Sequence, residues 1–188
     1  MSTKRIVITG GPGTGKTMLV TALEEEGFFC FHEVIRDMTL EAKNGNTENL
    51  ELVNPIAFVE DSKSFNNKLL QLRLAQFHKA NNPDVHSYFY DRGMPDVLAY
   101  MDYFGQVYEP SYQELCAKHR YDQILILPPW KEIYVQDNER MENFEQATAI
   151  HEHLENTYRS IGYNVTEVPF GTVSERLQFV KEFITLER

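Results

Sequence analysis

The 188-residue sequence predicts an α/β fold with three layers (α/β/α), in which a five-stranded parallel sheet lies between two layers of helices. Five short apolar segments alternate with longer amphipathic segments along the chain, and this order is typical of parallel strands joined by helices. No internal repeat, low-complexity tract or linker interrupts the alternation. Because one domain usually contains about 100–200 residues, we expect residues 1–188 to fold as a single domain.

Two strands and two helices are expected in the first part of the chain. Residues 6–9 are apolar and β-branched and are followed by glycines, which predicts a buried strand, and residues 28–32 are the candidate for the second strand. Residues 16–26 place apolar side chains on one helical face, and Gly27 should end that helix. Apolar side chains recur at helical spacing over residues 57–80, so we expect a long helix there.

The second part of the chain continues the same alternation. Residues 124–127 are the clearest buried strand, and the pair Pro128 and Pro129 should end it. The other expected elements are strands at residues 87–90 and 164–168 and helices over residues 97–104, 111–118, 144–161 and 174–186. A helix over 144–161 would stop at Gly162.

A glycine-rich loop between the first strand and the first helix carries the strongest functional signal. Residues 10–17 fit G-x-x-x-x-G-K-S/T, the phosphate-binding loop (P-loop) in which backbone N–H groups surround a phosphate. Lys16 can reach the β- and γ-phosphates, and the Thr17 hydroxyl can bind Mg²⁺. A dinucleotide-binding G-x-G-x-x-G is excluded because Lys16 stands where its third glycine belongs. The expected nucleotide contacts are Gly11, Pro12, Gly13, Thr14, Gly15, Lys16, Thr17 and Met18.

Two carboxylates follow predicted strands at the edge of the sheet where ligands of such folds bind. Asp91 follows residues 87–90 and could hold Mg²⁺ directly or through water. Glu33 follows residues 28–32 and could act as a general base on a substrate hydroxyl or as an outer ligand of the metal. Acids at such junctions also serve as helix caps, and the sequence does not decide which of the two would be the base.

Three arginines are candidate binding or catalytic groups. Arg92 is adjacent to Asp91, and Arg36 lies one helical turn after Glu33, so both could clamp a substrate or the transferred phosphate. The alternative for Arg36 is a plain surface ion pair with Glu33. Arg140 lies in the polar segment 130–143, which follows the fourth strand where a lid could close over the phosphates. A solvated helix of mixed charge is the alternative for that segment.

The charge balance and composition restrict the partners of the protein. The chain has 18 Lys and Arg against 28 Asp and Glu, a formal net charge of −10. This argues against long nucleic acids, whose backbones are bound by clustered cations, whereas a nucleotide needs only a few local donors. Two cysteines give no disulfide framework. No secretory signal and no apolar run near the ~18 residues of a membrane span occur, so we expect a cytoplasmic protein.

Some weaker signals are interpreted as structural. His151 and His153 are two residues apart on a predicted helix and so face different directions, which argues against a shared metal. Residues 102–105 read D-x-x-G but fall in a predicted helix, and no N-K-x-D occurs, so a Ras-type GTPase is unsupported. The aromatic residues of segment 88–90 are expected in the core.

Several segments together resemble one family, the small AAA-like P-loop ATP-binding domain found in ribosylnicotinamide-kinase-like proteins and in the TRPL translocation defect protein. The segments are the P-loop, Glu33-x-x-Arg36, Asp91-Arg92-Gly93 with Pro95-Asp96 and Tyr100, Pro128-Pro129-Trp130 and residues 168–176. The resemblance implies a nucleotide-kinase-like P-loop NTPase with strand order 2-3-1-4-5 and a lid after the fourth strand.

The resemblance also implies roles for individual residues. By similarity to nucleoside kinases, Glu33 activates a substrate hydroxyl, Asp91 and Arg92 form the acid–arginine pair after the third strand, and the loop of Gly171, Thr172 and Val173 borders adenine. The lid of those kinases usually has several arginines, whereas residues 130–143 offer only Lys131 and Arg140 as Lys or Arg cations.

The sequence thus leads to two functional hypotheses. The first is a Mg²⁺- and ATP-dependent kinase of a small, nucleoside-like hydroxyl compound, with GTP as an alternative donor and the acceptor unidentified. The second is a nucleotide-dependent ATPase or GTPase switch that has no small-molecule acceptor. The oligomeric state, including a homodimer, stays open.

Overall fold

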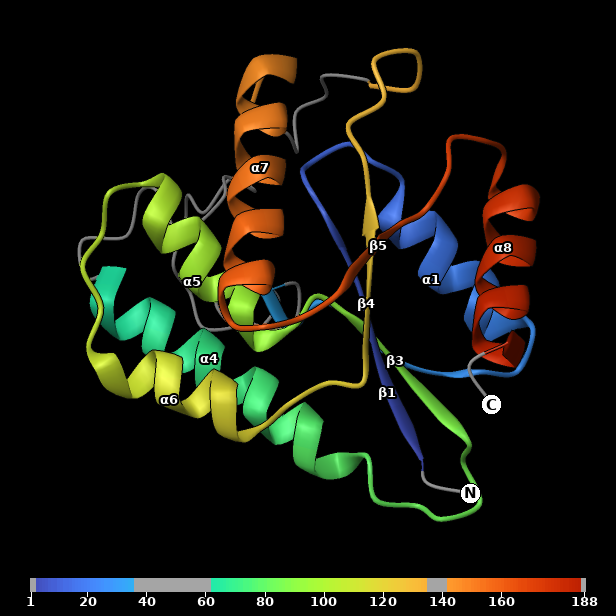
Figure 1. The fold of residues 1–188 in the computed structure, drawn as a ribbon, viewed down its shortest axis with the longest axis horizontal. Helices are drawn as coiled ribbons and strands as arrows, with labels where there is room; N and C mark the ends of the chain where they lie inside the picture. Colours follow the sequence, from blue (N-terminus) through green and yellow to red (C-terminus); the bar gives the residue numbers. More distant parts are fainter. Residues whose placement is uncertain (1–2, 36–61, 135–141, 187–188) are drawn as a thin grey trace, which may run out of the picture.

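The computed structural model describes residues 3–35, 62–134 and 142–186. Its strands form one parallel five-stranded sheet in the order β2-β3-β1-β4-β5, which confirms the expected topology (Figure 1). The strands are β1 (Lys4–Gly10), β2 (Phe29–Phe31), β3 (Ser87–Asp91), β4 (Gln123–Leu127) and β5 (Val165–Glu167). The two edge strands, β2 and β5, are shorter than expected, because only three residues of each pair with the neighbouring strand.

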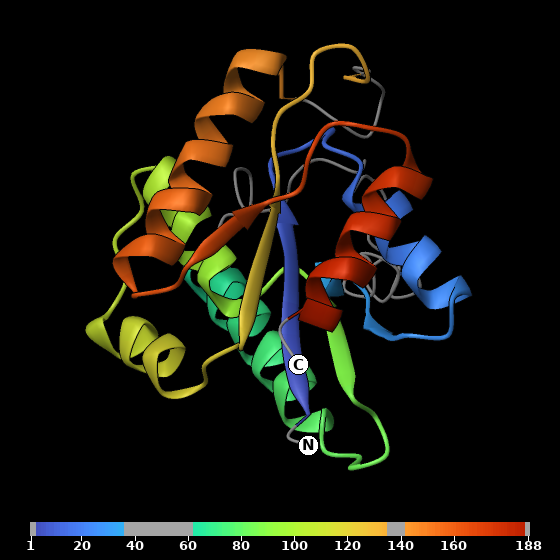
Figure 2. The same ribbon diagram turned by 45° about the vertical axis from the view of Figure 1, so that its right-hand side comes forward.

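Helices cover both faces of the sheet, which confirms the three layers. Helices α1 and α8 lie on one face, and α4, α5, α6 and α7 lie on the other (Figures 1 and 2). The helices in the described residues are α1 (Lys16–Glu25), α4 (Ser62–Lys79), α5 (Met94–Tyr103), α6 (Pro110–Lys118), α7 (Phe144–Ser160) and α8 (Val173–Leu186). None of these helices combines the length and the apolar character that crossing a bilayer requires.

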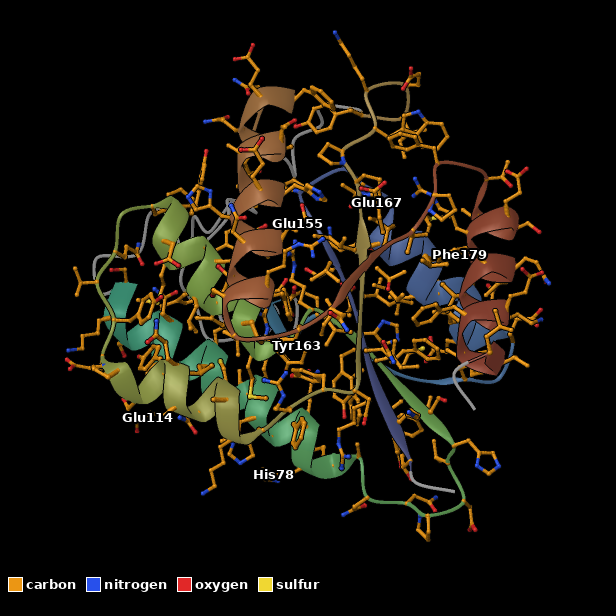
Figure 3. All side chains as sticks on the ribbon, in the orientation of Figure 1. His78, Glu114, Glu155, Tyr163, Glu167 and Phe179 are labelled. Atoms are coloured by element: carbon orange, nitrogen blue, oxygen red, sulfur yellow. The ribbon has the colours of Figure 1, made fainter. Side chains whose placement is uncertain are left out.

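The alternation of side chains along the strands builds two hydrophobic cores. In β1, Ile6 and Ile8 face α1 and α8, whereas Val7 faces the helices of the opposite layer. Phe179 and Tyr163 lie on these two different sides of the sheet (Figure 3). The aromatic residues 88–90 of β3 are at most 1% exposed, so their expected place in the core is confirmed.

The strand register brings the predicted functional segments to one edge of the sheet. Ile8 of β1 is opposite Asp91 of β3, and Gly10 is opposite Leu127 of β4. Phe31 of β2 is opposite Tyr90, so the residues that follow β2 arrive beside the carboxyl end of β3. The P-loop follows β1 directly and therefore lies between these ends, at the upper end of the strands in Figure 1.

The helix boundaries show how local chemistry sets the ends of elements. Helix α1 ends at Glu25, and Gly27 follows with a φ of 87°, so glycine ends this helix as expected. Helix α5 already begins at Met94, because Pro95 fits the first turn and the Asp96 carboxylate accepts a hydrogen bond from the Gly93 N–H at 2.9 Å.

Candidate active site

The P-loop between β1 and α1 folds around its own lysine side chain. Gly13 and Gly15 have φ angles of 73° and 88°, a left-handed conformation that glycine adopts without steric cost. The Lys16 ammonium donates hydrogen bonds to the Gly11 carbonyl at 2.6 Å and to Thr14 Oγ1 at 3.3 Å. Only 8% of Lys16 is exposed. The loop expected to bind phosphate therefore encloses a buried cation.

The environment of Lys16 lowers its pKa to about 7. Desolvation is the largest cause, and the positive charge of Arg92 acts in the same direction. The carboxylates of Asp91, Asp96 and Glu33 act against this shift. A polyphosphate beside Nζ would add negative charge and favour the ammonium form. The protonation of Lys16 therefore depends on whether an anion lies next to it.

The two residues expected to hold a metal, Thr17 and Asp91, lie at the start of α1 and at the end of β3, at the edge of the sheet where the P-loop follows β1. Thr17 is in the first turn of α1, and Asp91 is the last residue of β3 and is 5% exposed. Hydroxyl and carboxylate oxygens suit Mg²⁺, which usually keeps waters and binds substrate phosphates as well. Across residues 3–35, 62–134 and 142–186, no group of three or more His, Cys, Asp or Glu could hold a metal.

Glu33 lies between two arginines at the carboxyl end of β2. Its Oε1 accepts a hydrogen bond from Arg73 Nη2 at 3.0 Å, and its Oε2 lies 2.7 Å from Arg92 Nε. Arg73 also donates to the Gly93 carbonyl at 2.9 Å. All three charged side chains are largely buried. The structure thus gives Glu33 two deeply placed cationic partners, one of which is the expected Arg92.

Asp96 is a second buried carboxylate that holds Arg92 in place. Its Oδ1 accepts hydrogen bonds from Thr9 at 2.6 Å and from Arg92 Nη1 at 3.2 Å, and Tyr158 donates to Oδ2 at 2.5 Å. Burial opposes ionisation of Asp96, but Arg73, Arg92 and the two hydroxyl donors outweigh it and lower the pKa of the carboxyl. The carboxylate therefore connects β1, α5 and α7, and it also holds the Arg92 guanidinium.

The backbone of Arg92 adopts an unusual conformation. Its φ of 74° makes it the one residue other than glycine with a positive φ in the described residues. Its N–H donates to the Ile8 carbonyl at 3.0 Å, and its guanidinium lies 5.2 Å from the centre of the Tyr100 ring. Such conformations persist where the surroundings over-determine them, and they concentrate at functional sites.

The loop before α8 forms a closed turn. The Glu175 carboxylate accepts hydrogen bonds from the N–H and hydroxyl of Thr172 at 2.7 Å and 2.8 Å, which lowers the pKa of Glu175. Val173 is the first residue of α8, and Gly171 directly precedes this turn. Met18 on α1 is 61% exposed. The loop and Met18 lie on the face of the sheet covered by α1 and α8, and their contact with a nucleotide stays a prediction.

Two of the expected arginines fall outside the described residues. These are Arg36 and Arg140, and the central part of the lid-like segment 130–143 also lies outside the described residues. The described ends of that segment lie at the P-loop, where the Tyr134 ring contacts Gly13 closely enough to exclude a Cβ atom there. The Tyr134 hydroxyl also donates a hydrogen bond to the Glu142 carbonyl.

A family model described as an AAA domain (AAA_28) matches residues 5–176, which is most of the chain. The chain belongs to this family. The match includes the P-loop, Glu33, Asp91-Arg92 and the loop before α8. No curated protein sequence matches the chain.

Solved structures share the fold of this AAA domain at low sequence identity. The deoxyadenosine kinase from M. mycoides with bound dATP has a TM-score of 0.64 at 13% identity, covering 96% of this chain and 99% of the kinase. The thymidylate kinase from Candida albicans has a TM-score of 0.70 at 13% identity, covering 98% and 92%. The NadR protein in complex with NR has a TM-score of 0.70 at 21% identity, covering 97% of this chain and 50% of NadR. These likenesses establish a nucleotide-kinase-like fold.

Three site residues of this AAA domain received no role in the sequence analysis, namely Arg73, Asp96 and Arg176. Arg73 shares the buried face of α4 with Leu69 and Leu70, so a cation in an apolar stripe was the available signal. Asp96 was named only as part of a family segment, because an acid in the first turn of a helix resembles an ordinary cap. Arg176 contacts the P-loop from α8, and no local pattern marks such a distant pair.

Proposed function

We propose that this protein is an ATP-dependent kinase that transfers a phosphoryl group to a hydroxyl of a small, nucleoside-like compound. The observation that carries the proposal is the placement of the buried Glu33–Arg92 pair and Asp91 at the same edge of the sheet as Lys16. A kinase needs this combination, because phosphoryl transfer depends on positioned cations and on a carboxylate near the attacking hydroxyl. The fold shared with structures named as kinases supports it.

Each residue has a stated role in this proposal. The P-loop amides and Lys16 bind the β- and γ-phosphates, and Thr17 and Asp91 would hold Mg²⁺, which neutralises charge on the phosphates. Arg92 stabilises the charge that develops on the transferred group. Arg36 and Arg140 remain proposed clamps for substrate and phosphate, and Gly171, Thr172 and Val173 remain the proposed border of the nucleobase.

The proposed reaction is a single in-line displacement. The acceptor oxygen forms a bond to the γ-phosphorus while the bond from that phosphorus to the β,γ-bridging oxygen breaks, so ADP leaves. The acceptor proton passes to the Glu33 carboxylate, which must turn one oxygen from its arginine partners to the hydroxyl. Arg73 keeps its backbone contact to Gly93 and holds Glu33 near the acceptor while this occurs. Asp91 is the alternative base.

An acceptor panel tests the kinase proposal. ADP formation is measured with and without nucleosides, nicotinamide riboside and other small alcohols. We expect at least one acceptor to raise turnover, Glu33→Gln to lower kcat by about 100-fold or more, and Lys16→Ala to abolish nucleotide binding. Glu114→Gln on the outer surface of α6 is the matched control and should behave as wild type (Figure 3). Turnover that no acceptor changes would contradict a kinase.

A nucleotide-dependent switch is the second candidate, because both Glu33 oxygens already accept hydrogen bonds from arginines. In a switch, this ion-pair network would be structural, and nucleotide would alter the surface offered to a partner. The same measurements separate the two functions. A switch predicts ATP or GTP binding with slow turnover that is unchanged by every acceptor and by Glu33→Gln.

A further inference from the structure

Arg176 on α8 forms hydrogen bonds with the P-loop from outside the phosphate site. Its side chain is 3% exposed. Nη1 donates to the Thr14 carbonyl at 2.7 Å, and Nε donates to the Pro169 carbonyl at 3.2 Å. One guanidinium therefore joins the P-loop to the segment that follows β5, and Arg176 itself lies 162 positions after Thr14.

Neighbouring side chains fix the position of this guanidinium. Arg176 lies 5.2 Å from the centre of the Trp130 ring, and the Trp130 and Phe170 rings are 5.3 Å apart. A Cβ atom on Gly15 would lie 3.1 Å from Arg176 Nη1 and 3.8 Å from Ile133 Cδ1. The arginine thus occupies the space directly behind Gly15, where aromatic and aliphatic side chains limit access of water.

The hydrogen bond to Thr14 has a consequence for the phosphate site, because a peptide group is planar. In a trans peptide the C=O of one residue and the N–H of the next point in opposite directions. The Thr14 carbonyl and the Gly15 N–H belong to one peptide group, so a carbonyl directed outward to Arg176 directs the N–H inward. Gly15 alone would not enforce this orientation, because glycine tolerates both positive and negative φ.

We propose that Arg176 is a positioning residue that orients the Thr14–Gly15 peptide, so that the Gly15 N–H points at a bound phosphate. The inference rests on the proposed nucleotide binding at the P-loop and adds to it a residue outside the motif. It requires that Arg176 strengthen binding of the phosphates of a ligand to the same extent whether or not the ligand carries a nucleobase.

Binding of ATP and of inorganic tripolyphosphate to wild type and to Arg176→Met tests the proposal. We expect the variant to weaken both ligands by a similar factor of about ten, the scale of one lost charged hydrogen bond. Arg176 Nη2 is buried and has no hydrogen-bond partner among the described residues, so direct contact with a nucleobase is the competing role. Weakened binding of ATP with unchanged binding of tripolyphosphate would establish that role and overturn the proposal.

The amide signal of Gly15 gives a second readout that a general loss of stability or charge would not move. The protein has 10 glycines, so ¹⁵N-glycine labelling gives a simple spectrum. Tripolyphosphate should shift the Gly15 amide proton strongly downfield in wild type and only weakly in Arg176→Met, while Gly13 still responds. An equal Gly15 shift in both proteins would overturn the proposal.

Control variants separate the outcomes. Lys181→Met removes another cation of α8, one that pairs with Glu26 on the surface, and should bind both ligands as wild type does. If Arg176→Met does not fold, Arg176→Gln is measured in the same way, because its shorter, uncharged side chain cannot place a donor where Nη1 meets the Thr14 carbonyl. A Gly15 signal in that variant that responds as in wild type would equally overturn the proposal. Failure of wild type to bind either ligand would instead contradict the proposed function.

Discussion

At the scale of single residues, the positive charge of Lys16 suits a phosphate, but the buried environment of the side chain disfavours that charge. Its pKa of about 7 means that the side chain is largely neutral at pH about 8. The phosphates of ATP favour the charged form, so binding at that pH should take up close to one proton per nucleotide. Calorimetry in buffers of different ionisation enthalpy measures this uptake.

Two variants show whether Lys16 is the group that takes up the proton. Lys16→Arg keeps the positive charge but stays protonated at every accessible pH, so uptake should fall to near zero. Lys63→Arg, on an exposed part of α4, should leave the uptake unchanged. Nucleotide binding without proton uptake by wild type at pH about 8 would show that the amine is already charged.

At the scale of elements, the sequence predicted best what depends on neighbouring residues. The P-loop could be recognised because its chemistry occupies consecutive positions, and residues 124–127 because a fully buried strand is apolar throughout. Glu33 was also placed correctly after β2. Its partner Arg73 could not be inferred, because it lies 40 positions away on a helix whose packing depends on the whole fold.

Asp96 is the clearest case in which one side chain connects several elements. Asp96→Asn leaves the Arg92 guanidinium without one buried counter-charge, so we expect the free energy of unfolding to fall by about 3 kcal/mol. Urea denaturation near neutral pH measures the change. Asp102→Asn, an exposed aspartate on the same helix, should change it by about 0.5 kcal/mol or less.

The pH dependence of this loss identifies its cause. The pKa of Asp96 is lower in the folded protein than in the unfolded chain, so its stabilising effect is complete above the ordinary aspartate pKa of about 3.9. As the pH falls below that value, the unfolded chain binds the proton first and the stabilisation is lost. The difference between wild type and Asp96→Asn should therefore shrink below about pH 4. A difference that stays constant at acidic pH would point to packing instead.

At the scale of the whole molecule, a net charge of −10 coexists with a local group of cations at one edge of the sheet. Lys16, Arg73, Arg92 and Arg176 are all buried or nearly so. Lys16 and Arg92 are the two that we expect a small anion inside the site to reach, whereas a long polyanion along the surface would not reach them. The fold thus separates a buried group of cations from the charge that faces solvent.

This separation predicts selectivity by size. ATP should raise the melting temperature of the protein, because a ligand that binds only the folded state stabilises it. A long single-stranded oligonucleotide at the same phosphate concentration, in about 0.15 M salt, should leave it unchanged. A rise with the oligonucleotide that matches the rise with ATP would mean that a surface patch binds polyanions.

The packing of Trp130 under Arg176 gives the protein an optical probe of its own. The chain contains one tryptophan, so all indole fluorescence originates at the back of the P-loop. The indole reports on a guanidinium one hydrogen bond away from Thr14, without a label and without a second emitting site. Rapid mixing with nucleotide can therefore test in real time whether the surroundings of the P-loop change on binding.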